Sequence, residues 1–241
     1  MNIFFMIVSM LNPSHLSKIQ QKMKIVSFGD IHEDSGNLSL LKNELESADL
    51  VIATGDLTNY NGKKEAEEVI EEIMKYNENI LAQLGNLDQP EVNDYLNEKG
   101  INLHRNGFIR DDIGIFGVGG SNLTPFNTPT EFSENEIEAF LLEGLEKVKE
   151  AEFKIMVPHM PPKDTKIDMI TIGAHVGSQS VRDFILRHKP DISLSGHIHE
   201  ARGTDKLEDT LIFNAGMFRE GGYVIITKQS EGIFAELKVL P

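Results

Sequence analysis

Short apolar runs alternate with longer segments of helical periodicity along most of this chain, and this alternation limits the folds open to it. The runs are rich in Ile, Val, Leu and Phe and are bounded by turn residues, which is the pattern of buried strands. They cover residues 24–28, 50–54, 80–84, 113–118, 153–157 and 192–195. The alternation predicts an α/β domain.

Five segments between these runs carry apolar residues at helical spacing with charged residues opposite, which predicts surface helices. They cover residues 38–45, 63–76, 92–99, 133–149 and 178–188. The last part of the chain differs, because strands are predicted over 211–214, 222–227 and 233–239 with turn-rich links and no helix between them. We expect these strands to form a second, largely antiparallel sheet.

The domain organisation follows from length and linkers. The chain has 241 residues and no evident repeat or Pro-rich linker, so we expect a single domain over residues 23–241. Residues 1–22 are predicted to be an apolar extension. Its apolar stretch, residues 3–11, is too short to span a bilayer, and the extension lacks the features of a secretory signal. It either packs on the domain or precedes the true start at Met23, and we expect a cytoplasmic protein.

Composition excludes several classes of partner. The chain has 38 acidic and 23 basic side chains, and its formal charge of -15 repels nucleic acid and anionic membranes. We therefore expect neither polymeric nucleic acid nor a membrane as a partner. The chain has no cysteine, which excludes disulfide bonds and thiolate zinc sites.

Residue types that bind divalent metals follow five of the predicted strands. Open α/β sheets bind ligands at the carboxyl ends of their strands, where a sharp loop can aim a side chain inward. The stretches are Gly29–Asp30–Ile31–His32, Gly55–Asp56, Gly85–Asn86–Leu87–Asp88, His159, and Gly196–His197–Ile198–His199. Carboxylates, imidazoles and an amide from several strand ends are the donor set of a two-metal site.

Each stretch alone has an ordinary alternative. An Asp-x-His or Gly-Asp sequence is often a turn, Asn86 can cap a helix, and His159 can be a structural histidine. His-x-His pairs also arise by chance. The joint occurrence of all five at strand ends favours metal binding. His15, His104 and His188 lack ligand-like partners, so we interpret them as surface or capping residues.

The order Asp-x-His, Gly-Asp, Gly-Asn-x-Asp, His and Gly-His-x-His resembles that of the calcineurin-like metallophosphoesterases from Met23 to the end of the chain. Residues 175–178, 181–185, 196–200 and 213–216 are similar to the branch called Icc-related phosphoesterases. The resemblance implies an α/β (α+β) fold with two facing β-sheets flanked by helices, a four-layer metallophosphoesterase sandwich.

The same resemblance implies two divalent ions. The first would be bound by Asp30, His32 and His199, the second by Asn86, His159 and His197, and Asp56 would bridge them. Mixed nitrogen and oxygen ligands suit manganese, iron, zinc or cobalt better than magnesium alone. Two such ions ~3.5–4 Å apart can hold a bridging hydroxide for in-line attack on phosphorus.

Leu87 departs from the family pattern, because the wider family has a histidine there that resembles a general acid. Losing a general acid typically slows a reaction ~10²–10⁴-fold. Asp88 would orient that histidine, and we expect it instead to support the loop around Asn86 through hydrogen bonds just outside the metal ligands. The long segment 160–179 can fold over the site and supply His175 as a replacement acid; alternatively, His175 is a loop or capping histidine.

These observations predict a dinuclear metal-dependent phosphohydrolase for a small phosphoester. Phosphodiesterase action on a small or nucleotide-like ester is preferred over monoesterase action. Because of Leu87, the alternative is a metal-stabilised, non-catalytic binding or scaffold protein of the same fold. A nuclease is a third possibility that the acidic charge disfavours. Residues 119–130 are a further candidate for the substrate rim, or else a solvated loop, and a homo-oligomer remains open.

Overall fold

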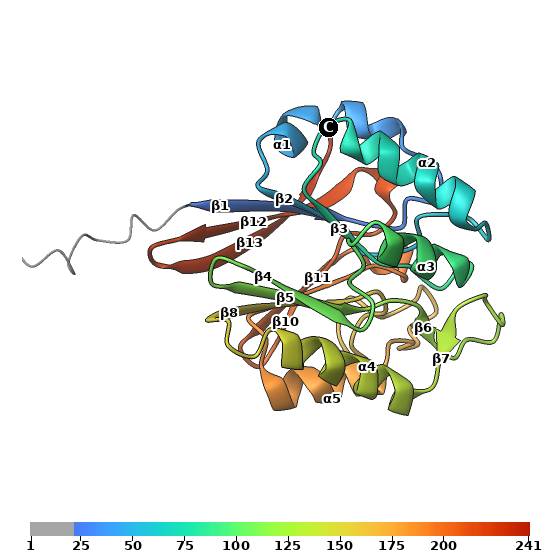
Figure 1. Cartoon of the computed structure of the whole chain (residues 1–241). Helices are drawn as coiled ribbons and strands as arrows, with labels where there is room; N and C mark the ends of the chain where they lie inside the picture. Colours follow the sequence, from blue (N-terminus) through green and yellow to red (C-terminus); the bar gives the residue numbers. More distant parts are fainter. Residues whose placement is uncertain (1–21) are drawn as a thin grey trace, which may run out of the picture.

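Two large β-sheets face each other and carry helices on their outer surfaces, which gives four layers (Figure 1). The computed structural model describes residues 22–241, so the predicted extension over 1–22 lies outside it apart from Lys22. The predicted α/β sandwich of two facing sheets is confirmed. Among the described residues, no helix is both long enough and apolar enough to cross a bilayer.

The first sheet has five strands in the order β13-β12-β1-β2-β3, and helices α1, α2 and α3 lie on its outer side (Figure 1). Strands β1 to β3 are parallel, whereas β12 and β13 run antiparallel to their neighbours. The elements are β1 (Met23–Phe28), α1 (Lys42–Glu46), β2 (Leu50–Ala53), α2 (Lys63–Met74), β3 (Ile80–Ala82), α3 (Glu91–Glu98), β12 (Gly222–Gln229) and β13 (Gly232–Val239).

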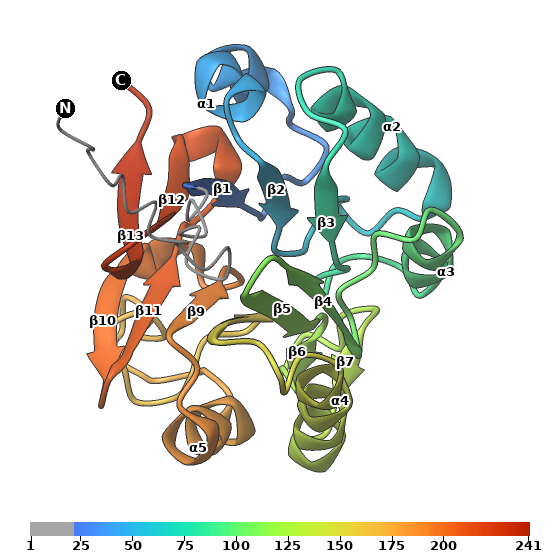
Figure 2. The same ribbon diagram turned by 60° about the vertical axis from the view of Figure 1, so that its left-hand side comes forward.

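The second sheet has six strands in the order β10-β11-β9-β8-β5-β4, and α4 and α5 cover its outer side (Figure 2). Its central strands are parallel and its two edge strands are antiparallel. The elements are β4 (Asn106–Arg110), β5 (Ile113–Val118), α4 (Glu134–Lys147), β8 (Phe153–Pro158), α5 (Gln179–His188), β9 (Ile192–Ser195), β10 (Gly203–Leu207) and β11 (Thr210–Asn214). A separate pair joins β6 (Ser121–Asn122) to β7 (Glu131–Phe132).

The C-terminal strands do not form a sheet of their own, so that prediction was wrong. Strands β12 and β13 extend the first sheet beside β1, and β11 joins the second sheet parallel to β9. Alternating apolar residues predict that a segment forms a strand. They do not predict which edge of which sheet that strand pairs with. The pairing of Val26 with Ile225 is set by tertiary packing rather than by neighbouring sequence.

Local signals explain where several helices begin. Ser133 and Glu136 form a capping box at the start of α4, and the hydroxyl of Ser178 accepts a hydrogen bond from the Val181 amide at the start of α5. The predicted helix over 38–45 is instead a 3-10 turn, η2 (Gly36–Ser39), followed by the short α1. The Ser39 hydroxyl donates back to the Gly36 carbonyl and helps to close that tight turn.

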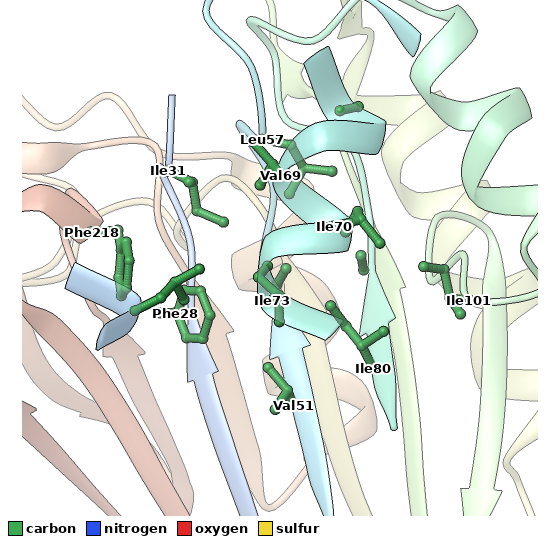
Figure 3. Packing of buried hydrophobic residues seen from close by; sticks show 14 of the residues in the cluster. Phe28, Ile31, Val51, Leu57, Val69, Ile70, Ile73, Ile80, Ile101 and Phe218 are labelled. Atoms are coloured by element: carbon green, nitrogen blue, oxygen red, sulfur yellow. The ribbon is translucent and has the colours of Figure 1, made fainter. Parts of the chain in front are cut away.

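The hydrophobic core occupies three spaces between the four layers. Val69, Ile70 and Ile73 of α2 pack toward Val51 on the outer face of the first sheet (Figure 3). Alternate strand residues point the other way and fill the space between the sheets, while a third cluster lies under α4 and α5. Burial on both faces explains why the central strands are continuous apolar runs.

The two sheets are tied together where the loops carrying the predicted ligands begin. The buried Gln83 amide nitrogen lies 3.2 Å from the Thr54 carbonyl of the first sheet's loop and 2.9 Å from the Val157 carbonyl of β8. The Gly196 amide donates to the His159 carbonyl over 2.9 Å, which joins the loops after β9 and β8. Strand ends from both sheets therefore open onto one site.

Candidate metal centre

One group of predicted ligands converges from both sheets. Asp30, His32, Asp56 and His199 each offer an atom that lies within 4.8 Å of those of the other three. His199 Nε2 lies 3.1 Å from Asp30 Oδ1 and 3.2 Å from His32 Nε2. Asp30 and His32 follow β1, Asp56 follows β2, and His199 follows β9.

A second group adjoins the first through Asp56. His159 Nε2 lies 3.3 Å from Asn86 Oδ1 and 3.5 Å from Asp56 Oδ2. His197 Nδ1 lies 2.7 Å from the same Asn86 oxygen. Asp56 Oδ2 is also 3.9 Å from His32 Nε2, so this carboxylate contacts both groups. The structure thus brings all seven predicted ligands together and places Asp56 between the two sets.

The backbone of four of these residues is held in the left-handed region. The φ angles are 51° at Asp30, 49° at His32, 49° at Asp56 and 65° at His197. Non-glycine residues seldom adopt this conformation, and it persists where surrounding structure imposes it, often at functional sites. Here the Asp30 amide donates to the Gly55 carbonyl over 2.9 Å, and the His32 amide donates to the Asp56 carbonyl over 3.0 Å.

Two glycines allow the ligand loops to approach each other. A Cβ atom at Gly85 would lie 2.1 Å from Asp56 Oδ1, and one at Gly196 would lie 2.0 Å from Asp30 Oδ2. Real side chains cannot tolerate such contacts, so these positions require glycine for close packing rather than for turn geometry alone.

Hydrogen bonds leave ligand lone pairs facing the site. His32 Nδ1 lies 3.3 Å from the Thr58 carbonyl and His159 Nδ1 lies 3.1 Å from the Thr54 carbonyl, so each Nδ1 donates, and in the neutral ring each Nε2 presents a lone pair. The Asn86 amide nitrogen donates to Thr128 Oγ1 over 3.1 Å, which turns the Asn86 oxygen toward the histidines. Converging lone pairs with mixed nitrogen and oxygen donors fit divalent transition metals.

The site also concentrates charge. Burial by itself would raise the pKa of Asp56, but His159 and His32 outweigh it and lower that pKa to about 2. Burial opposes charge on the His159 ring, yet the Asp56 carboxylate outweighs it and raises the His159 pKa to about 9. Burial and the nearby His159 lower the pKa of His197 to about 4. The Asp56–His159 contact is thus a position that attracts positive charge.

Asp88 supports the loops rather than a catalytic histidine. Its buried carboxylate accepts hydrogen bonds from the amides of Leu57 (3.0 Å), Thr58 (2.7 Å) and Gly85 (2.7 Å). Burial and the charge of Asp56 raise the pKa of Asp88 to about 7. These contacts join the loop after β2 to the loop that carries Asn86. Hydrogen bonds that support the Asn86 loop are what the sequence predicts for Asp88.

A cavity of about 650 Å³ opens beside the predicted metal ligands. Leu87 and His175 line it together with Asp56, Asn86 and His197. The predicted segment 160–179 therefore does place His175 beside the site. Residues of the segment 119–130 line the same cavity, namely Asn122, Leu123, Thr124, Pro125, Phe126 and Thr128.

Asp168 is a residue at this site that the sequence interpretation missed. Its Oδ1 lies 2.7 Å from His175 Nδ1, and its fully buried carboxylate also accepts from the amides of Thr165 (2.9 Å) and Gly177 (3.1 Å). The available signal was an acidic residue between two apolar neighbours, Ile167 and Met169, in the segment 160–179 that is expected to fold over the site.

The remaining histidines lie elsewhere. His104 Nδ1 accepts the Gly119 amide over 3.0 Å, and its ring packs against Phe132 and Phe140. His188 packs against Phe184. Both rings take part in aromatic packing, so the interpretation as surface or capping residues understated their burial. His15 lies outside the described residues.

Comparisons with known proteins agree with this geometry. A sequence model of the calcineurin-like phosphoesterases matches residues 23–201. An uncharacterized protein of Methanocaldococcus jannaschii is 36% identical over 197 residues, which cover 80% of this chain and 87% of that protein.

Solved structures share the fold at low identity. A protein of Thermus thermophilus has a TM-score of 0.68 at 17% identity, covering 92% of this chain and 100% of its own. A putative 5'-nucleotidase from Staphylococcus aureus has a TM-score of 0.57 at 14% identity, covering 91% and 54% respectively. A dimetal phosphatase from Danio rerio has a TM-score of 0.52 at 11% identity, covering 91% and 99%.

Proposed function

This chain belongs to the calcineurin-like phosphoesterase family and is a metal-dependent phosphoester hydrolase, and we propose that it acts on phosphodiesters of small or nucleotide-like compounds. The observation that carries the proposal is the contact of Asp56 with two adjoining ligand groups, each with lone pairs directed inward. We also propose that residues 23–241 form one domain, that the protein is cytoplasmic, and that manganese, iron, zinc or cobalt is the native metal.

Each side chain has a defined part in this proposal. Three residues of the first group would hold one ion, three of the second would hold another, and Asp56 would contact both. These are Asp30, His32 and His199, then Asn86, His159 and His197. When bound, the two ions supply a nucleophile at neutral pH and neutralise charge on the phosphoryl group. The Thr58, Thr54 and Thr128 contacts orient His32, His159 and Asn86 for this purpose.

His175 is the proposed source of the leaving-group proton. The Asp168 carboxylate accepts the Nδ1 proton, which leaves Nε2 as the nitrogen that can exchange a proton with a bound ester. This His–Asp pair would take over the role that Leu87 and Asp88 do not fill.

The shape of the site favours a diester. A second hollow of about 420 Å³ shares the wall from His197 to Glu200 with the larger cavity and is also lined by Met217 and Arg219. A phosphodiester carries two substituents that can occupy the two hollows, whereas a monoester carries one. This arrangement supports phosphodiesterase action over monoesterase action.

The test is hydrolysis of bis(p-nitrophenyl) phosphate and p-nitrophenyl phosphate by the manganese-loaded protein, with bound metal quantified in parallel. We expect metal-dependent hydrolysis, faster on the diester, that Asp56→Asn abolishes. If metal is bound but neither ester is hydrolysed above the Asp56→Asn control, the chain is a metal-stabilised, non-catalytic scaffold. Leu87, which cannot act as a general acid, would be compatible with that role. Faster monoester hydrolysis would overturn only the diester preference.

A further inference from the structure

The cavity beside the metal ligands has an exposed apolar wall. Leu123 is 70% exposed, Phe126 is 77% exposed and Tyr60 is 52% exposed, and all three line the cavity with Leu87 and Ile170. Folded proteins seldom leave several large apolar side chains exposed together unless a ligand or partner covers them. We call Tyr60, Leu87, Leu123, Pro125, Phe126 and Ile170 the apolar wall.

The loop that carries Leu123, Pro125 and Phe126 of the apolar wall is held in place by one carboxylate. Glu131 accepts hydrogen bonds from the amide and hydroxyl of Thr124 (3.1 and 2.6 Å) and from those of Thr128 (2.8 and 2.7 Å). Thr128 also accepts from the Asn86 amide, so the loop is coupled to a metal ligand. The exposure of Leu123 and Phe126 therefore belongs to an ordered loop, and binding to it needs little further ordering.

Charges around the cavity favour an uncharged substituent. Among the described residues that line it, Lys163 is the single lysine or arginine. Glu134 and Glu200 also line the cavity, and their carboxylates are fixed by hydrogen bonds from the Ser180 amide (2.8 Å) and the Thr171 amide (2.6 Å). A second anionic group on a bound ester would meet these carboxylates with few cations to offset them.

We propose that the apolar wall binds an uncharged aryl or alkyl substituent of the phosphoester and thereby selects such esters over polyphosphates and other esters whose substituent carries a second negative charge. This inference rests on the proposed function, because the phosphoryl group must be held at the metal ligands for the substituent to reach the wall. Leu87 then has a positive role, since it continues the apolar surface up to Asn86 and Asp56.

The experiment is calorimetric binding of phosphonates to the manganese-loaded protein, which requires no turnover. Phenylphosphonate should bind about 10–100-fold more tightly than methylphosphonate, since each buried methylene contributes roughly fourfold. Phosphonoacetate, which carries a second anion, should bind no more tightly than methylphosphonate. In the double variant L123S/F126S, the ratio of the affinity for phenylphosphonate to that for methylphosphonate should fall at least tenfold. The affinity for methylphosphonate itself should stay the same.

The matched control is L142S/F234S, which changes two exposed apolar residues away from the cavity and should leave every affinity unchanged. Equal affinity for phenylphosphonate and methylphosphonate, or a preference that survives in L123S/F126S, would overturn the apolar wall alone. Absence of metal-dependent binding of either phosphonate would instead overturn the proposed function. If L123S/F126S only converts an oligomer to a monomer, the wall is a contact between copies of the chain, and the proposal is wrong.

Discussion

Leu87 and His175 line the same cavity but differ in whether their side chains can transfer a proton. The Leu87 amide donates to Asp56 Oδ1 over 2.8 Å, so this position still orients the carboxylate between the ligand groups. Its side chain can neither donate nor accept a proton. His175 reaches the same cavity from another loop and is paired with Asp168, and we propose that it supplies the leaving-group proton instead.

His175→Ala should slow hydrolysis most for esters with poor leaving groups, because an acid matters most when the departing oxygen is basic. On a series of aryl methyl phosphates we expect losses of ~10²–10⁴-fold for the most basic phenols and much smaller losses for p-nitrophenol. Asp168→Asn should show the same trend with smaller losses, and His188→Ala serves as a control outside the site. Equal losses across the series would remove His175 from the acid role.

His104 predicts a loss of stability in acid. Burial, with a smaller contribution from Arg105, lowers its pKa from 6.5 to about 4 in the folded protein. The unfolded chain therefore binds a proton between these values when the folded protein does not, so the stabilisation is complete above pH 6.5 and is lost as the pH falls toward 4. The contribution is up to about 3 kcal/mol.

Urea unfolding of the metal-free protein at about pH 7.5 and about pH 5, on either side of the ordinary histidine pKa, measures this effect. The free energy of unfolding of His104→Gln should fall less between the two pH values than that of the original chain. Parallel losses in the two proteins would show that His104 is not responsible.

At the scale of elements, the site depends on how closely the loops after parallel strands can approach. The loops after β2 and β3 share the Asp88 carboxylate through the amides of Thr58 and Gly85. Gly85 lies directly against Asp56, so its missing side chain sets the spacing between the two loops.

Gly85→Ala should therefore displace Asp56 and lower the affinity for metal. We expect a loss of roughly 10–100-fold, as is usual when a residue that supports a metal ligand is changed. Gly203→Ala is the matched control, since a Cβ there would meet no atom closer than 3.7 Å. Calorimetric titration with manganese compares the two variants. An unchanged affinity in Gly85→Ala would mean that the loops adjust without cost.

Sequence periodicity predicted most central elements, because strands such as β5 and β9 are buried on both faces. It missed β4 and β10, which are edge strands with partly exposed and polar residues such as Asp205 and Lys206. The seven proposed ligands could be named because each lies within four residues after the end of a strand and because their order resembles that of a known family. Asp168 was not predicted, because its pairing with His175 depends on the conformation of the loop between them. Hydrophobic periodicity does not predict loop conformations.

At the scale of the whole molecule, the seven proposed ligands come from both sheets. Asp30, His32, Asp56 and Asn86 follow strands of the first sheet, and His159, His197 and His199 follow strands of the second. Metal ions held between them would link the two halves of the sandwich. Since the ligands are far apart in the unfolded chain, metal binding should stabilise the entire fold.

Saturating manganese should therefore raise the free energy of unfolding, by about 3 kcal/mol at a free concentration roughly 100-fold above the Kd. Thermal unfolding with manganese and with a chelator measures the shift. Asp56→Asn should show little or none of it. A wild-type chain that unfolds at the same temperature in both conditions would contradict a metal link between the sheets.

In the proposed site, Asp56 lies between two metal ions. Electron paramagnetic resonance of the protein titrated with Mn²⁺ tests it most directly, because two manganese ions that share a ligand are magnetically coupled. We predict two ions per chain with the spectrum of a coupled pair, and loss of that coupling in Asp56→Asn. A single bound ion, or two ions that show no coupling in the original chain, would contradict a position of Asp56 between two metal ions.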